Sequence, residues 1–257
     1  MPSIQFVSDL HLEFAENREF LRYNPLVPSA DILVLAGDII SDKYKKKAEP
    51  FYQEWRKNFK HVIAIAGNHE YYYGEIRYAY PYYFKKLAEN HYKVNNRTVI
   101  LENTRFICST LWTFIPPEHA REIEHRISDY RQILYSQKEQ DLRTISTRDV
   151  NFFHQISRSY LETELKQPFD GKTVVVTHHL PSFALLPDED KNTALRYYCA
   201  SELDEVIISS QPRYWIVGHY HKSVHKTIGQ TECISNPLGY MDENQRHSFA
   251  FANSLEV

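Results

Sequence analysis

Seven residues with metal-binding side chains each follow closely behind a short apolar segment of the chain. Imidazole, carboxylate and a single amide, with no thiolate, suit Mn, Fe, Zn or Co better than copper or an iron–sulfur cluster. Seven ligands exceed what one tetrahedral zinc ion needs, so the set predicts two metal ions that share a bridging carboxylate. The residues are Asp9, His11, Asp38, Asn68, His178, His219 and His221.

The spacing of these residues and the glycines beside them strengthen the prediction. Asp9-Leu-His11 and His219-Tyr-His221 would each place two side chains on one side of an extended segment, because residues i and i+2 face alike. Glycine is scarce, with seven residues in the chain, and it suits sharp backbone turns and close approaches. Three of the seven directly precede proposed ligands, namely Gly37, Gly67 and Gly218.

Each of these motifs alone has an ordinary structural explanation. A strand-end turn would account for Asp9-Leu-His11, and a surface pair for His219-Tyr-His221. Gly37-Asp38 alone carries almost no information, whereas Gly67-Asn-His-Glu70 after a buried strand is moderately specific. Their ordered occurrence, each behind an apolar segment, favours a single metal centre over these explanations.

Five apolar segments must position these side chains, and each is typical of a strand buried on both faces. They are too short for helices and contain β-branched residues. Helix-length stretches at 43–59 and 75–91 follow two of them, and this alternation predicts an α/β fold with at least partly parallel strands. Ligand sites in such sheets form beyond the carboxyl ends of the strands, so the loops should meet at one point. The segments are 4–7, 31–36, 62–66, 173–177 and 214–217.

The rest of the chain predicts a second sheet, because further strands are expected in the middle and in the tail. Glu102-Asn103 and Gly229-Gln230 are expected to form tight turns between neighbouring strands. The additional strands would lie at 98–101, 104–110, 223–228, 231–235 and 248–252.

Residues 112–171 interrupt the strand pattern and are expected to form a helical insertion. Apolar residues recur there at steps of three and four from Val150 to Leu165, which predicts an amphipathic helix. Ser146 or Thr147 is the expected N-cap. The sequence contains no linker, repeat or low-complexity tract, so one domain over 1–257 is predicted.

Composition excludes several other classes of protein. The net charge is −3, so no global field favours nucleic acid, and the run Lys43–Lys47 is typical of a solvated helix face. The three cysteines are far apart and lack a C-x-x-C spacing, which argues for a reducing compartment. Neither a signal peptide nor an apolar run of membrane-spanning length is expected. We therefore expect a cytoplasmic protein that does not enter the membrane.

The motifs D-x-H, G-D, G-N-H-E, a histidine after a buried strand, and G-H-x-H appear complete and in order. In this respect the chain resembles the calcineurin-like metallophosphoesterase superfamily, over residues 4 to about 240. Three further segments resemble a bacterial branch of that superfamily. They are Thr110-Leu-Trp-Thr113, Ser128-Asp-Tyr-Arg131 and Asn236-Pro-Leu-Gly-Tyr240.

The resemblance implies a four-layer α-β-β-α sandwich, made of two mostly mixed β-sheets with flanking helices. It implies that one metal ion is held by Asp9, His11 and His221, and the other by Asn68, His178 and His219, with Asp38 bridging them. His69 would face the leaving group while a metal-bridging hydroxide attacks phosphorus. Some relatives orient this histidine with an aspartate three positions after the bridging residue. Here that position is Ser41, followed by Asp42, so the partner of His69 is open.

The expected substrate is a small phosphorylated molecule, and a phosphomonoester, a phosphodiester and a pyrophosphate all stay open. A nucleotide is compatible with the composition, whereas the lack of a basic stripe disfavours nucleic acid. Arg131 is a candidate phosphate clamp, and His179 a candidate substrate contact. The aromatic residues Tyr71–Tyr73, Trp112 and Phe114 could stack on a base or a phenyl group, although packing is their commoner role.

Two rival functions differ in class. A non-catalytic, metal-holding interaction module would lack His69 or show an eroded set of metal ligands, and neither is seen in the sequence. A single-zinc hydrolase, such as a metallopeptidase, would bind about one metal ion per chain.

Overall fold

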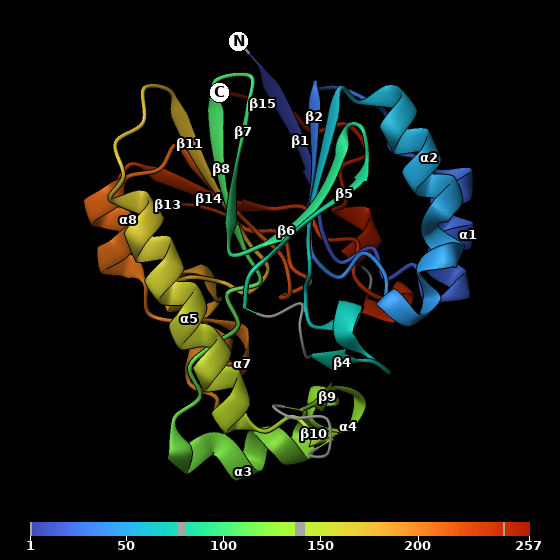
Figure 1. The fold of residues 1–257 in the computed structure, drawn as a ribbon. Coiled ribbons are helices and arrows are strands. Elements are labelled where there is room, and N and C mark those ends of the chain that lie inside the picture. The colour runs from blue at the N-terminus through green and yellow to red at the C-terminus, as the bar shows by residue number, and fades with distance from the viewer. Residues whose placement is uncertain (1, 77–80, 137–141, 244) are drawn as a thin grey trace.

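Two six-stranded β-sheets, packed face to face, form the centre of the described part of the chain (Figure 1). The computed structural model describes residues 2–76, 81–136, 142–243 and 245–257. The first sheet has the order β15 (Leu255–Glu256), β1 (Ser3–Val7), β2 (Ile32–Ala36), β3 (His61–Ile65), β6 (His91–Asn95), β5 (Tyr83–Ala88). The second has the order β13 (His225–Ile228), β14 (Thr231–Ser235), β12 (Tyr214–Val217), β11 (Lys172–Thr177), β8 (Thr104–Ser109), β7 (Arg97–Leu101).

Both sheets are mixed in the same way. The four inner strands of each sheet run parallel, and both edge strands run antiparallel to their neighbours. Helices α1 (Ala15–Tyr23) and α2 (Glu49–Asn58) cover the outer face of the first sheet, and α5 (Thr147–Leu165) and α8 (Asp204–Ser210) that of the second. The expected four-layer α-β-β-α sandwich is confirmed.

The strands are apolar throughout because each sheet buries both of its faces. In β2, Val34 points into the core between the sheets, whereas Leu33 and Leu35 point toward α1 and α2. Opposite Val34, the second sheet contributes Phe106 and Val174 to the same core. A parallel strand covered on both sides needs no polar alternation, which explains the short continuous apolar segments of the sequence.

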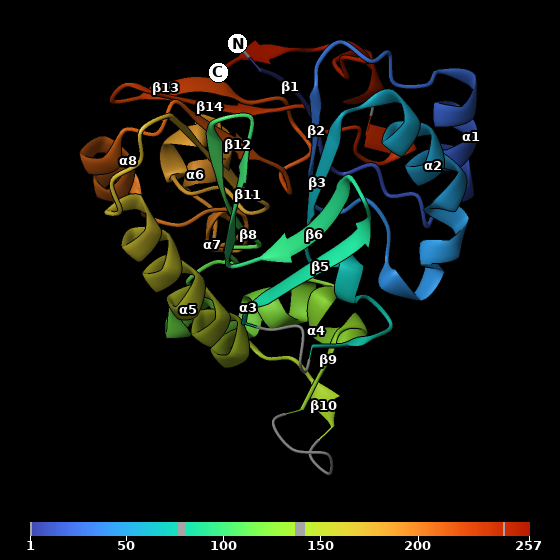
Figure 2. The same cartoon turned by 45° about the horizontal axis from the view of Figure 1, so that its top comes forward.

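The prediction of helix over 75–91 is wrong. The chain forms β4 (Glu75–Ile76) and then the antiparallel pair β5 and β6, while residues 77–80 lie outside the described residues. β6 pairs with β3 and so extends the parallel part of the first sheet (Figure 2). Pairing with a partner distant in sequence decides the structure here, and local helix propensity is too weak a preference to oppose it.

Two other expectations need correction. Residues 248–252 form no strand. The strand near the end of the chain is instead β15, which pairs with β1. The helix expected over 43–59 is divided into the 3-10 helix η1 (Asp42–Ala48) and α2, whose first turn contains Pro50. Proline suits the first turn of a helix because its missing N–H has no partner there.

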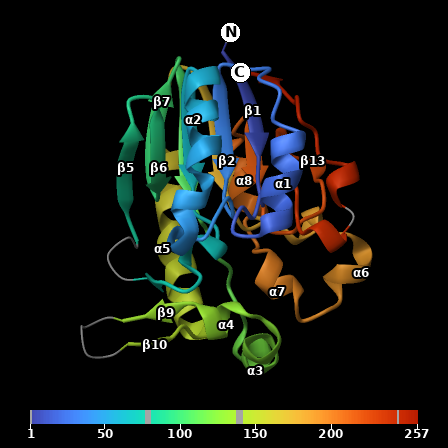
Figure 3. The same ribbon diagram turned by 90° about the vertical axis from the view of Figure 1, so that its right-hand side faces the viewer.

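The region 112–171 contains the predicted helices: α5 runs along the second sheet, and the helices before it lie at the end of the molecule opposite the two termini (Figures 1 and 3). Residues 137–141 of this region lie outside the described part. Ser146 caps α5 as expected, and the Asp149 carboxylate accepts its backbone N–H at 2.8 Å. The other elements of the region are α3 (Pro117–Arg126), α4 (Asp129–Gln132), β9 (Leu134–Tyr135) and β10 (Arg143–Thr144).

Short helical turns complete the fold around the carboxyl ends of the strands. None of the described helices is long and apolar enough to cross a membrane. The turns are η2 (His69–Tyr71), η3 (Phe183–Leu185), α6 (Asp188–Lys191), α7 (Arg196–Cys199), η4 (Met241–Glu243) and η5 (Gln245–His247).

Candidate metal centre

The loops behind β1, β2, β3, β11 and β12 bring all seven proposed ligands to one buried place. Besides a group formed by His11 with Glu13 and His69, two groups of side chains there have ligand atoms that all lie within 4.8 Å of one another. Asp38 belongs to both groups, as a bridging carboxylate would. The groups are Asp9, His11, Asp38 and His221, and Asp38, His178 and His219.

The backbone at five of these residues adopts the left-handed conformation. A non-glycine residue at positive φ costs about 1–3 kcal/mol and persists mainly at functional sites, where the surrounding structure enforces it. The expectation that D-x-H and H-x-H are extended is therefore wrong, and His219 and His221 join different groups. The φ angles are 53° at Asp9, 45° at His11, 54° at Asp38, 69° at His219 and 55° at His221.

In the first group, two imidazole nitrogens face each other at hydrogen-bond distance. Nε2 of His11 lies 2.9 Å from Nε2 of His221. Nδ1 of His11 lies 3.2 Å from the Glu13 carboxylate, and Nδ1 of His221 lies 2.6 Å from that of Glu243. A carboxylate only accepts, so each Nδ1 carries a proton, and in the neutral rings each Nε2 presents a lone pair. Two lone pairs at this distance fit a shared cation.

In the second group, ring nitrogens likewise face possible metal-binding atoms of other side chains. Nδ1 of His178 donates to the carbonyl oxygen of Ala36 at 2.9 Å, so in the neutral ring its Nε2 presents a lone pair. That Nε2 lies 3.2 Å from Oδ1 of Asn68 and 3.4 Å from Oδ2 of Asp38. Nδ1 of His219 lies 3.1 Å from the same Asn68 oxygen. The facing acceptors fit a second cation.

The charge of Asp38 favours a proton on the neighbouring imidazole of His178. Burial works to lower the pKa of His178, but Asp38 raises it to about 10. A cation at Nε2 would replace that proton, so metal binding should release protons. Oxygen and imidazole donors suit Mn, Fe, Zn or Co, and the three cysteines are free.

The glycines before the ligands leave space for the site. A Cβ added to Gly67 would overlap the Asp38 carboxylate and the imidazole of His178, and one added to Gly37 would overlap the same imidazole. Glu70, the last residue of the G-N-H-E motif, stabilises the loops of the site through hydrogen bonds to their backbone. Its carboxylate accepts the backbone N–H groups of Asp38 at 2.9 Å, Ile39 at 2.8 Å and Gly67 at 2.6 Å.

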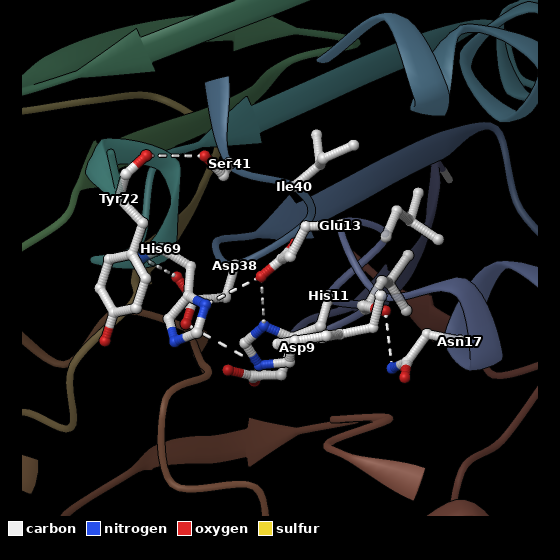
Figure 4. A network of polar contacts seen from close by, with 12 residues as sticks. Asp9, His11, Glu13, Asn17, Asp38, Ile40, Ser41, His69 and Tyr72 are labelled. Carbon is white, nitrogen blue, oxygen red and sulfur yellow. Dashed lines mark hydrogen bonds and ion pairs between the residues drawn. The ribbon is translucent and has the colours of Figure 1, made fainter. Parts of the chain in front are cut away.

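The orienting partner of His69, left open by the sequence, is Glu13. Figure 4 shows the Glu13 carboxylate between His11 and His69, and its Oε1 lies 2.8 Å from Nδ1 of His69. Ser41 instead donates to the carbonyl oxygen of Tyr72, and Asp42 pairs with Lys93. Glu13 stands two residues after His11, a spacing that could have pointed to it.

Electrostatics agree with this pairing. Burial works to raise the pKa of Glu13, but hydrogen bonds from His11 and His69 lower it to about 2. Burial works to lower the pKa of His69, but Asp38 and Glu13 raise it to about 9. The raised pKa favours a protonated His69 at neutral pH.

Asp129 is a second functional residue that the sequence analysis missed, although the segment 128–131 was singled out. It is buried, and its carboxylate accepts the amide N–H of Asn68 at 3.0 Å and the hydroxyl of Tyr72 at 2.6 Å. An amide that donates to Asp129 must present its oxygen to His178 and His219. Asp129 thereby fixes the orientation of the Asn68 side chain.

The two candidate substrate contacts, Arg131 and His179, bond to backbone carbonyl oxygens in the structure. The Arg131 guanidinium donates to the carbonyl oxygen of His125 on the surface. His179 is 1% exposed, its Nδ1 donates to the Thr110 carbonyl oxygen at 3.1 Å, and its ring packs 4.1 Å from that of His219. Neither bond is directed toward the cluster, and contact of these two side chains with a substrate stays a prediction.

Most of the suspected aromatic residues belong to the core of the insertion. Tyr71, Tyr72 and Trp112 are buried, whereas Tyr73 and Phe114 are about half exposed. The ring of Tyr72 also stacks on that of His69, with 4.0 Å between the ring centres. Packing is thus the role of the buried rings, as their sequence context favoured.

Comparison with known proteins agrees with the geometry. A curated relative, an uncharacterized protein of Acanthamoeba polyphaga mimivirus, is 26% identical over 277 residues, which cover 98% of this chain and 96% of the relative. The crystal structure of phosphopantetheinyl hydrolase (PptH) from Mycobacterium tuberculosis is similar in fold, with a TM-score of 0.68 at 15% identity over 99% of this chain and 95% of that one.

The family model of the calcineurin-like phosphoesterases matches residues 2–223, a span that contains every residue of both metal groups. The chain belongs to the calcineurin-like phosphoesterase family.

Proposed function

We propose that the enzyme, a metal-dependent phosphoesterase by family, hydrolyses a small phosphate ester at the cluster centred on Asp38. The observation that carries this proposal is that acceptor atoms face one another at two places. Nε2 of His11 faces Nε2 of His221, and the Asn68 side-chain oxygen lies between His178 and His219. When bound, two cations would polarise the phosphoryl oxygens and lower the pKa of a water molecule between them.

The residues of the cluster would then have distinct roles. We assign one cation to Asp9, His11 and His221, the other to Asn68, His178 and His219, and the bridge to Asp38. His69 lies beside the cluster without belonging to either group that holds Asp38. Its protonated ring would stabilise charge on the departing oxygen, with Glu13 holding the ring in place. The eroded site of a non-catalytic relative is not found among the described residues.

A panel of metals and substrates tests the proposal. The protein is loaded with Mn, Fe, Co or Zn, and elemental analysis measures the metal content of each sample. Aryl phosphate mono- and diesters are then supplied to each. We expect about two ions per chain and hydrolysis of at least one ester class, since two-metal sites clamp both the attacking and the leaving oxygen. One ion per chain, or no hydrolysis by fully loaded protein, would contradict the proposal.

Replacing Glu13 should impair chemistry more than folding. In Glu13→Gln the shape is kept, but the charge that holds a proton on His69 is lost. We expect kcat to fall by about 10–100-fold, the loss typical when the partner of a metal-ligating histidine is removed, because Glu13 also contacts His11. Glu13 raises the pKa of His69, so its loss lowers that pKa, and the basic limb of the kcat profile should move to lower pH.

Glu16→Gln is the matched control, because Glu16 is exposed on α1. It should leave both kcat and the pH profile unchanged. If Glu13→Gln lowers kcat without moving the basic limb, Glu13 has only a structural role.

A reducing compartment remains part of the proposal. Cys108 and Cys233 are buried, Cys199 is partly buried, and all three are free thiols. Burial raises the pKa of Cys199 to about 12 and that of Cys233 to about 12, so both stay protonated and unreactive. These thiols support the cytoplasm as the site of action.

A further inference from the structure

The hydroxyl of Tyr240 lies 3.0 Å from Nε2 of His69. Nε2 is the only ring nitrogen of His69 available to a substrate, because Nδ1 faces Glu13. A ring nitrogen forms one hydrogen bond, in the plane of the ring. Tyr240 therefore occupies the one direction in which His69 could reach a leaving group.

The position of Tyr240 is held by several independent contacts. Its ring centre lies 4.5 Å from that of His11 and 4.6 Å from that of His221. Its backbone N–H donates to the Glu243 carboxylate at 2.9 Å, and the N–H of Gly239 donates to the carbonyl oxygen of Asp9 at 3.0 Å. These contacts place the phenol beside the first metal group.

We propose that the Tyr240 hydroxyl, which is in contact with Nε2 of His69, donates the hydrogen bond to the leaving-group oxygen. A phenol oxygen can accept a hydrogen bond from one neighbour while its O–H donates to another, so the charge of His69 can act on the leaving group through Tyr240. The inference rests on the proposed hydrolysis, in which the bond between phosphorus and the leaving-group oxygen breaks and charge grows on that oxygen. The opposing arrangement has the substrate displace Tyr240 and contact His69 directly.

Tyr240→Phe separates the two arrangements, since it keeps the ring that packs on His11 and removes only the hydroxyl. Metal-loaded wild type and variant are compared on phosphate esters with one phosphoryl group and three leaving groups: 4-nitrophenol, phenol and a simple alcohol. We expect kcat to fall roughly 100-fold for the alkyl ester and by less than about threefold for the nitrophenyl ester, because a donor matters most where most charge develops. Metal content should equal that of wild type.

Tyr23→Phe is the control, since Tyr23 is 79% exposed at the end of α1, and all rates should be unchanged in it. Equal or faster turnover of the alkyl ester by Tyr240→Phe would overturn the inference, as would an equal loss on every ester or a loss of metal. A wild-type protein that hydrolyses none of the esters would overturn the proposed function and this inference together.

Discussion

Asp38→Asn is expected to lose metal ions and nearly all activity. Oδ2 of Asp38 lies 3.4 Å from Nε2 of His178 and 3.9 Å from Nε2 of His11, so its charge serves both metal groups. Losing a mere supporting partner of a ligand already costs about 10–100-fold in metal affinity. Each bound cation stabilises the transition state by several kcal/mol, so activity should fall by roughly 10³-fold or more.

Elemental analysis after dialysis, followed by hydrolysis assays with and without added metal, measures both effects. Asp42→Asn is the matched control, because Asp42 lies four positions along the chain and pairs with Lys93, with its side chain 55% exposed. That variant should keep its metal and its activity. Full metal occupancy in Asp38→Asn would show that Asp38 is not the shared ligand.

The strands could be predicted because their signal is local. A segment such as 31–36 is apolar at every position, and a strand buried on both faces needs that pattern. The hairpin at 83–95 was missed for the opposite reason. Four of the six residues of β5 are exposed, and β6 exists because it pairs with β3, about thirty residues earlier. No local pattern records that pairing.

The candidate site also contains residues that local sequence patterns indicate and residues that they do not. Ligands directly behind strands could be inferred, since the sheet gathers the carboxyl ends of its parallel strands at one edge. The residues that orient them could not. Asp129 is 61 residues from Asn68, and Tyr240 is 171 residues from His69. Glu13 is close to His11 in sequence, but its contact with His69 depends on how two loops pack together.

His69→Asn should keep its metal and lose its chemistry. The backbone N–H of His69, and not its side chain, donates to Oδ1 of Asp38 at 2.8 Å, so the substitution leaves that support in place. The ring, by contrast, joins Glu13 to Tyr240, and no shorter side chain spans that distance. We expect kcat to fall by roughly 10²–10⁴-fold, or about 3–5 kcal/mol in the barrier. His125→Asn, on the exposed face of α3, should match wild type. Comparable turnover in the His69 variant would remove this histidine from the mechanism, whereas a loss of metal would make it a ligand.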